Sequence, residues 1–186
     1  GELIRQLRPL RPEDLRCFTV GTPVPGFKSW EAAVDDAHDS PIADPAQGLD
    51  MLYSSGTTGR PKGVKWPLPP IPAGARTMLV DLLAPLFGYG RDCRYLSPAP
   101  LYHAAPLRHS MTVIKLGGTA FVMASFDAER SLQWIARHRI THSQWVPTMF
   151  VRMLKLPQEV RARYDLSSLQ VAVHAAAPCP VEVKQG

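Results

Sequence analysis

The sequence is poor in cysteine, with only Cys17, Cys93 and Cys179 spread along 186 residues. An odd number of cysteines without a C-x-x-C pair argues against a disulfide framework and against a zinc ribbon. Ordinary reduced thiols are therefore expected. The sequence also lacks an apolar run long enough to cross a bilayer and a recognisable signal peptide. On these grounds we expect a cytoplasmic protein.

Long runs of one charge are absent as well, although the net charge is +5. The arginines between Arg5 and Arg16 lie far from Arg137 and Arg139, and no five or six like charges follow one another. Because nucleic-acid partners are usually met by a dense basic patch, we expect no nucleic-acid partner. A dispersed positive balance is compatible with anionic small molecules.

What the sequence does contain is an alternation of strand and helix patterns over its second half. Strand patterns cover 93–100, 119–125, 141–147 and 168–178. Helical patterns lie within 101–118, where Gly117 and Gly118 should end the helix, within 126–140, where Asp127 is the expected N-cap, and within 148–156. A further helical period covers 75–88, where Pro85 should kink or end the helix. This alternation predicts an α/β fold with a mostly parallel sheet flanked by helices.

The first part of the chain, 1–49, carries no diagnostic motif. A strand pattern covers 15–21, and a short helix is predicted over 26–37 with Ser29 as its N-cap. Turn-forming residues fill 38–48. We treat this part as a lead-in region to the remainder, 50–186.

The most informative stretch is LYSSGTTGRPKGV, residues 52–64, where a strand pattern runs into small residues. Glycine lets backbone N–H groups approach an anion closely, and hydroxyl groups add donors. Lys62 adds a mobile positive charge. The stretch therefore predicts a polyphosphate site rather than a flexible linker. A Walker loop is excluded, because Pro61 precedes the lysine and Gly63 replaces the magnesium-binding hydroxyl residue.

From Leu52 to Val64 the stretch resembles the phosphate-binding loop of the adenylate-forming acyl-CoA synthetases. Three later segments resemble that family in the same order. They are PLYHAAP (100–106), FDAERSLQWIARHRITHSQWVPTMF (126–150) and YDLSSLQVAVHAAAPCP (164–180). The likeness covers about residues 50–184, which is most of the chain.

The resemblance implies a chemistry and a set of substrates. Members of the family couple a carboxylic acid to ATP, release pyrophosphate, and pass the acyl group to coenzyme A. A fatty acid is the expected acid. The family often has threonine where Ser54 stands, and there it helps to hold Mg²⁺. Phosphate contacts are expected from the loop, at Ser54, Ser55, Gly56, Thr57, Thr58, Gly59 and Lys62.

The same resemblance places the acid beside His103, which would sit between its carboxylate and the α-phosphate. Lys62 and His103 are therefore the expected catalytic residues. The rest of the substrate pocket is expected at Tyr102, Ala104, Trp145 and Val146, although Trp145 also suits an ordinary core position. His138 and His142 show no metal-binding motif.

The adenine is expected beside Ala175, Ala176 and Ala177, in a turn that the family usually writes Gly-Ala-Ala-Pro or Gly-Gly-Ala-Pro. Here Ala175 replaces the usual glycine, and His174 replaces a common serine. An added methyl group could narrow the adenine or acyl channel.

The family's later motifs, including its magnesium glutamate and C-terminal lysine, are not found in the sequence. We therefore expect residues 1–186 to be an incomplete piece of one AMP-binding N-terminal domain, without the C-terminal domain and inactive alone. Two alternatives stay open: a ligase that transfers the acyl group to a carrier protein, and a non-catalytic nucleotide-binding module. Peripheral membrane contact of the whole protein is a further expectation.

Overall fold

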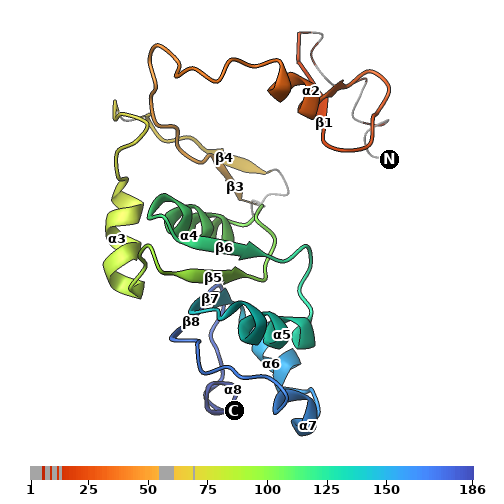
Figure 1. Ribbon diagram of the computed structural model, residues 1–186, viewed down its shortest axis with the longest axis vertical. Coiled ribbons are helices and arrows are strands. Elements are labelled where there is room, and N and C mark those ends of the chain that lie inside the picture. Colours follow the sequence, from red (N-terminus) through yellow and green to blue (C-terminus); the bar gives the residue numbers. More distant parts are fainter. Residues whose placement is uncertain (1–5, 7–8, 10–11, 13, 55–60, 69) are drawn as a thin grey trace. The chain divides into compact units, whose positions relative to one another are not determined.

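The computed structural model describes residues 6, 9, 12, 14–54, 61–68 and 70–186, which belong to two compact units, 1–45 and 46–186 (Figure 1). The first unit holds a two-stranded parallel sheet of β1 (Phe18–Thr19) and β2 (Lys28–Ser29), followed by α2 (Trp30–Asp35). The Ser29 hydroxyl accepts a hydrogen bond from the Ala32 N–H at 3.2 Å. The predicted N-cap is confirmed, and the helix is shorter than the sequence pattern suggested.

The second unit begins with a β-hairpin of β3 (Leu52–Ser54) and β4 (Lys62–Val64). The strands are antiparallel, and Ser54 pairs with Lys62 at the end of the hairpin that carries the loop. Lys62 begins strand β4, so no helix starts there. The predicted phosphate-binding residues Ser55 to Gly59 lie outside the described residues.

The main sheet has four parallel strands in the order β6-β5-β7-β8. The strands are β5 (Arg94–Ser97), β6 (Thr119–Val122), β7 (His142–Trp145) and β8 (Val171–His174). All four lie within ranges that the sequence predicted as strands. The predicted α/β fold is therefore confirmed, with the antiparallel hairpin as a separate small sheet.

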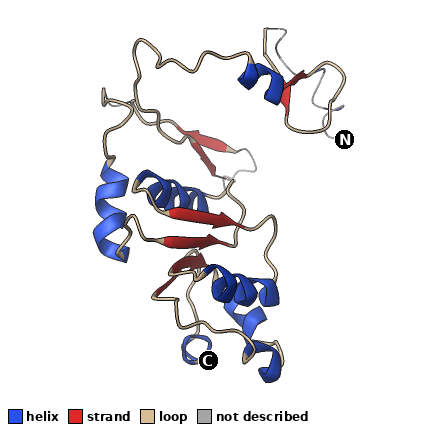
Figure 2. Ribbon diagram, viewed as in Figure 1, coloured by secondary structure: helices blue, strands red, loops and turns tan. Residues whose placement is uncertain are grey.

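Helices cover both faces of this sheet (Figure 2). Neighbouring residues of a strand point to opposite faces, so Tyr95 and Leu96 mark the two sides. Tyr95 packs with Val113 of α4 (Ala104–Lys115) and lies beneath α3 (Met78–Phe87), which packs on α4. Leu96 packs with residues of α5 (Ala128–His138) and α6 (Pro147–Leu154). The short helices α7 (Gln158–Arg161) and α8 (Val181–Gln185) follow.

Local signals in the sequence set several helix ends. The Asp127 carboxylate accepts from the Arg130 N–H at 2.8 Å and caps α5, as predicted. Pro85 lies in the last turn of α3, and the helix continues to Phe87 before Gly88 ends it with a φ of 69°. The missing N–H of Pro85 costs one hydrogen bond to the carbonyl four residues earlier, and α3 ends at Gly88, so less than one turn of helix follows the proline.

Gly118 is required by a close approach of the backbone after α4 to Val113 and to the turn that precedes β5. A Cβ at this position would lie 2.8 Å from Val113 Cγ1 and 2.9 Å from the Cys93 carbonyl oxygen. Its own N–H donates to the Val113 carbonyl at 2.9 Å and closes the end of the helix. The pair Gly117-Gly118 thus ends α4, as the sequence predicted.

Within the described part of the chain, no helix has the length and apolar character needed to span a membrane. A cytoplasmic location and peripheral membrane contact remain predictions.

Candidate functional site

The direction of the connections changes between β5 and β7. From β5, the chain passes through α4 to β6 on one side, whereas from β7 it passes through α6 and α7 to β8 on the other. In open α/β sheets, ligands bind at such a switch point, outside the carboxyl ends of the strands. We therefore expect a ligand-binding site at the segments that follow β5 and β7.

The segment after β5 holds Tyr102, His103 and Ala104. Tyr102 and His103 are exposed, and their ring centroids lie 4.5 Å apart. His103 is the N-cap residue of α4, and its side chain makes no capping hydrogen bond. Its imidazole is thus available to a ligand at the positive end of a 12-residue helix whose first turn has no acidic residue.

The segment after β7 holds Val146, which is half buried and precedes α6. Trp145 is the last residue of β7 and is only 1% exposed. Its indole N–H donates to the Ser143 hydroxyl, and its ring contacts Phe126 and Phe150. The structure places Trp145 in the apolar core on the α5 and α6 side, which agrees with the core position that its sequence also suited.

The segment after β8 holds the predicted adenine-side residues Ala175, Ala176 and Ala177. The Ala175 N–H donates to the Trp145 carbonyl at 3.1 Å and continues the pairing of β8 with β7. Ala176 has a φ of 72°, in the left-handed region that favours glycine. The form Gly-Gly-Ala-Pro has glycine at this position, so the tight turn persists here without it.

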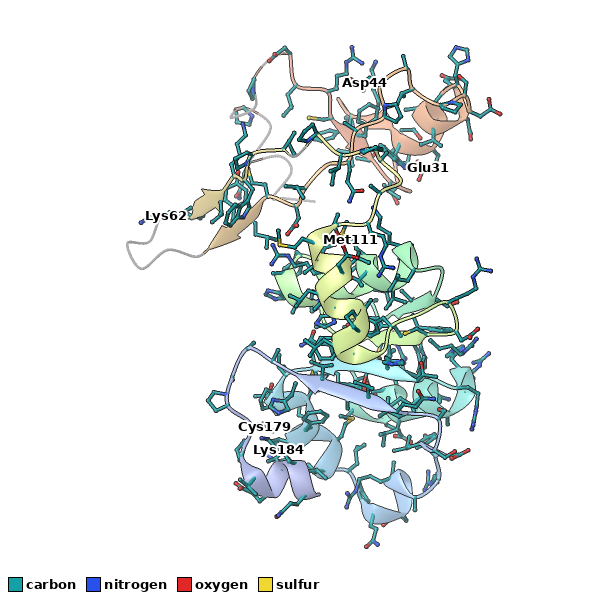
Figure 3. All side chains as sticks on the ribbon, turned by 90° about the vertical axis from the view of Figure 1, so that its left-hand side faces the viewer. Glu31, Asp44, Lys62, Met111, Cys179 and Lys184 are labelled. Atoms are coloured by element: carbon teal, nitrogen blue, oxygen red, sulfur yellow. The ribbon has the colours of Figure 1, made fainter. Side chains whose placement is uncertain are left out.

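Strands β5, β7 and β8 are neighbours and parallel. Their carboxyl ends therefore lie at one edge of the sheet, and the three predicted segments meet along this edge. Figure 3 shows Lys62 in the hairpin, where its side chain is exposed and directed away from the main sheet. The pairing of Lys62 with Ser54 sets it beside the point where the predicted phosphate loop begins.

Sequence reasoning missed two polar contacts between α4 and the chain that leads into β3. Arg108 donates through Nε to one carboxylate oxygen of Asp50, and its Nη2 lies near the same oxygen, with both distances 3.0 Å. Lys115 donates through its Nζ to the side-chain oxygen of Gln47. The partners are separated by 58 and 68 residues, so no local pattern could have identified them.

Two buried polar side chains close the carboxyl ends of the central strands. Ser97 of β5 is fully buried, and Gln144 of β7 is 2% exposed. The Gln144 amide donates to the Trp145 carbonyl at 2.9 Å. Neither Ser97 Oγ nor Gln144 Oε1 has a hydrogen-bond partner among the described residues. Unpaired buried oxygens of this kind are costly and call for a partner such as water.

Farther down the same face, burial changes the acid–base behaviour of a polar cluster. Desolvation lowers the pKa of His109 and of His142, and it raises the pKa of Cys93 to about 11. His142 Nε2 lies 3.0 Å from the Phe87 carbonyl oxygen, which can only accept, so Nε2 carries the proton. These groups are buried beneath α3 and α4, and we assign them to the core.

An apolar cavity of about 440 Å³ lies on the opposite face, between the α5–α6 side of the sheet and α8. Leu132, Ile135, Trp145 and Met153 contribute to its apolar wall, and His174 and Lys184 also line it. Among the described residues, no group of three or more histidine, cysteine or acidic side chains is suited to hold a metal ion.

Comparison with known proteins identifies the family of this chain. The model of a family described as AMP-binding enzyme matches residues 7–186. The chain is 34% identical over 156 residues to 4-coumarate–CoA ligase 5 of Oryza sativa subsp. japonica, a match that covers 83% of this chain and 27% of the relative. The chain spans about a quarter of the length of the curated relatives it matches.

Solved structures with the same fold include the inhibitor-bound N-terminal domain of FACL13 from Mycobacterium tuberculosis. That likeness has a TM-score of 0.63 and 25% identity, and covers 86% of this chain and 40% of the other. A putative long-chain-fatty-acid CoA ligase from Rhodopseudomonas palustris gives a TM-score of 0.73 at 20% identity, covering 99% of this chain and 44% of the other.

A third structure was solved with ligands. It is the o-succinylbenzoate coenzyme A synthetase MenE of Bacillus subtilis in complex with ATP and magnesium ion. The TM-score is 0.56 at 24% identity, and the likeness covers 73% of this chain and 26% of the other. The family model and the curated relatives confirm the resemblance drawn from the sequence motifs.

Proposed function

We propose that the protein containing this chain activates a carboxylic acid with ATP and transfers the acyl group to coenzyme A, because the chain belongs to the family of AMP-binding enzymes. The observation that carries this proposal is the position of His103. It lies at the switch point of the sheet, at the start of α4, with an imidazole that caps nothing. The positive N-terminal end of α4 and the hydrogen-bond donor of the imidazole would both stabilise the negative charge of the carboxylate and of the α-phosphate, which must come together in the reaction.

The proposed reaction has two steps. An oxygen of the acid's carboxylate attacks the α-phosphorus of ATP, the bond from that phosphorus to the bridging oxygen breaks, and pyrophosphate leaves. The thiolate of coenzyme A then attacks the acyl carbon, and AMP leaves with the electron pair of the broken C–O bond. Both steps move negative charge, so the protein must supply donors where that charge develops.

The donors follow from the chain. Ser54 to Gly59 and Lys62 would hold the β- and γ-phosphates and stabilise the leaving pyrophosphate. His103 would donate a hydrogen bond between the carboxylate and the α-phosphate, with Tyr102 and Ala104 beside it. Exposure of Lys62, Tyr102 and His103 is compatible with these roles, since each can reach a ligand.

The remaining roles are those of adenine and metal binding. Ala175, Ala176 and Ala177 would pack against the adenine at the end of β8, where the positive φ of Ala176 turns the backbone sharply. Hydroxyl and phosphate oxygens are hard ligands of the kind that Mg²⁺ binds. Ser54 and the triphosphate offer that donor set, and the bound ion would supply charge neutralisation of the phosphates.

The acid is proposed to be a fatty acid, held with Trp145 and Val146 in the wall of its pocket. The apolar side chains of these two residues support this choice. Of the proposed pocket residues, Trp145 alone lines the apolar cavity of about 440 Å³, so that cavity does not identify the acid. Hydroxycinnamic acids are the competing class, because the rice relative is called a 4-coumarate–CoA ligase. A panel of both acids in the exchange assay decides between them; a preference for 4-coumarate would overturn the fatty-acid assignment.

The central test is acid-dependent exchange between pyrophosphate and ATP, measured on the longest polypeptide that contains this chain. Lys62→Ala and His103→Ala are each expected to lower the exchange rate about a hundredfold, the size seen when one charge-stabilising donor is removed. Lys65→Ala is the matched control, since Lys65 is an exposed lysine three residues from Lys62. Equal exchange by all variants would refute the roles of Lys62 and His103.

The same protein distinguishes the two alternatives. Exchange without coenzyme A thioester formation, but with acyl transfer to a carrier protein, would identify an acyl-AMP ligase. Binding of Mg-ATP without any exchange would identify a non-catalytic module.

A further inference from the structure

The chain leading into the hairpin lies along α4. Gln47 and Asp50 contact Lys115 and Arg108, which are seven residues apart and therefore on one side of the helix. The earlier residue of the segment meets the later residue of the helix. The segment thus runs antiparallel to α4, toward the end where His103 lies.

The spacing supports this direction. Seven residues of helix rise about 10.5 Å, and three residues of nearly extended chain span about 10 Å. The segment is held at its start by the Gln47 N–H, which donates to the Ile71 carbonyl at 3.1 Å. Two side-chain contacts then follow along the helix, so the path into β3 is fixed at three points.

Of these contacts, the pair of Asp50 and Arg108 lies nearest to both proposed catalytic segments. Asp50 is two residues before β3, and Arg108 is five residues after His103. The side chain of Asp50 is 21% exposed and that of Arg108 is 36% exposed, so the ion pair is partly shielded from solvent. The guanidinium donates one hydrogen bond through Nε, and its Nη2 lies 3.0 Å from the same carboxylate oxygen, so a charge-assisted hydrogen bond holds the two side chains together.

We infer that the Asp50–Arg108 ion pair is a positioning contact that sets strand β3, and Lys62 paired with it, in register with His103. The inference rests on the proposed function, because it assigns the pair a role in that reaction. Neither side chain is expected to touch a substrate. The pair acts through β3 and through α4, whose relative position decides whether the phosphates and the carboxylate meet.

The test uses Asp50→Asn, Arg108→Met and their double variant in the pyrophosphate exchange assay. Each single variant is expected to raise the KM for Mg-ATP about tenfold and to change the KM for the acid less than about twofold, because displacement of a positioned group by about 1 Å costs that much or more. The double variant should be no worse than the singles, since both remove one contact.

The control is a second ion pair of the same chemistry. Arg76 Nε lies 3.0 Å from an Asp81 carboxylate oxygen at the start of α3, with side chains 57% and 59% exposed. Arg76→Met and Asp81→Asn should leave both KM values unchanged. Asp50→Glu keeps the charge and should recover most of the affinity for ATP, which a general loss of folding would not allow.

The outcomes separate this inference from the proposed function. The positioning role would be overturned if the KM for Mg-ATP were unchanged in the single variants. It would also be overturned if the rise in KM of the double variant equalled the product of the two single rises. If the unsubstituted protein shows no exchange but binds Mg-ATP in a calorimeter, the proposed function fails, and weaker binding by Asp50→Asn and Arg108→Met still supports the inference. If the unsubstituted protein does not bind Mg-ATP, both are overturned.

Discussion

On one face of the parallel sheet, Leu96 packs with Ile135, Trp145 and Met149 in a cluster of apolar side chains. On the other face, the neighbouring Tyr95 packs with histidine, tyrosine and cysteine side chains beneath α3 and α4. The first face is stabilised by the burial of apolar surface away from water. The second combines burial with polar groups that contact one another, Tyr89 with His109 and Cys93 with His142.

The difference follows the location of the proposed site. The helix over the polar face is α4, which begins after His103 and carries Arg108. Its buried residues include Ser110 and Thr112, whose hydroxyls have no hydrogen-bond partner among the described residues. Proteins keep costly buried polar groups most often near functional sites. We therefore expect the apolar face to carry stability and the polar face to carry the position of the site.

The largest effect is expected on the apolar face. Leu96→Ala removes a fully buried side chain and should cost about 2–5 kcal/mol of unfolding free energy, because transfer and cavity terms add. Urea denaturation measures this loss. Leu82→Ala, at a position 60% exposed on α3, should cost less than about 0.5 kcal/mol. A similar cost for both would show that the apolar cluster does not dominate stability.

The next effect sharpens the comparison where the polar face meets β6. Gly118→Ala would bring a Cβ within 3.0 Å of Val113 Cγ1 and of two backbone carbonyl oxygens, and backbone cannot move aside easily. A loss of about 1–3 kcal/mol is expected in the same denaturation experiment. Gly90→Ala is the control, since a Cβ there meets nothing within 4 Å. Equal stability of both variants would contradict the close approach.

The unfolding free energy should depend on pH through the histidines of the polar face. Burial lowers the pKa of His109 and His142 below the usual 6.5 in the folded protein. As the pH falls below about 6.5, the unfolded state therefore takes up protons first, and the unfolding free energy decreases. The stabilisation is complete above that pH and is lost toward the lower, folded-state pKa.

Each such histidine contributes at most about 1.4 kcal/mol per pH unit. Denaturation midpoints between pH 8 and pH 5 measure the slope. His109→Gln should flatten it, and His38→Gln, at an exposed position of the first unit, should not. An unchanged slope in His109→Gln would remove this residue from the explanation.

The sequence predicted the parts of the fold that depend on local chemistry. Ser29 and Asp127 cap helices through side chains that reach the N–H three residues away, so a short pattern suffices. The four strands were recognised as short apolar stretches between helical patterns, and prolines follow three of them. Their alternation with helices led to the prediction of a parallel sheet. A family resemblance assigned His103 to the acid and the alanines at 175–177 to the adenine, and the structure shows that these segments follow β5 and β8.

What the sequence could not predict depends on contacts between distant residues. Arg108 looks like any exposed helical arginine until the fold brings Asp50 to it across 58 positions. The positive φ of Ala176 gives no compositional signal, since alanine rarely adopts it. The sequence also did not predict that Leu96 packs in the apolar cluster and Tyr95 in the polar one, because both belong to the same strand pattern.

The smallest expected effect probes the cost of polarity on the α4 face directly. The Tyr95 hydroxyl is buried and has no hydrogen-bond partner among the described residues. Tyr95→Phe should therefore leave stability unchanged or raise it by up to about 1 kcal/mol, because an unpaired group is removed while the ring stays. Tyr89→Phe is the matched contrast, since the Tyr89 hydroxyl lies 2.7 Å from His109 Nδ1 and its loss should destabilise by about 1 kcal/mol. If Tyr95→Phe were the more harmful substitution, its hydroxyl would have to hold a buried water, and the polar face would be better satisfied than its side chains alone indicate.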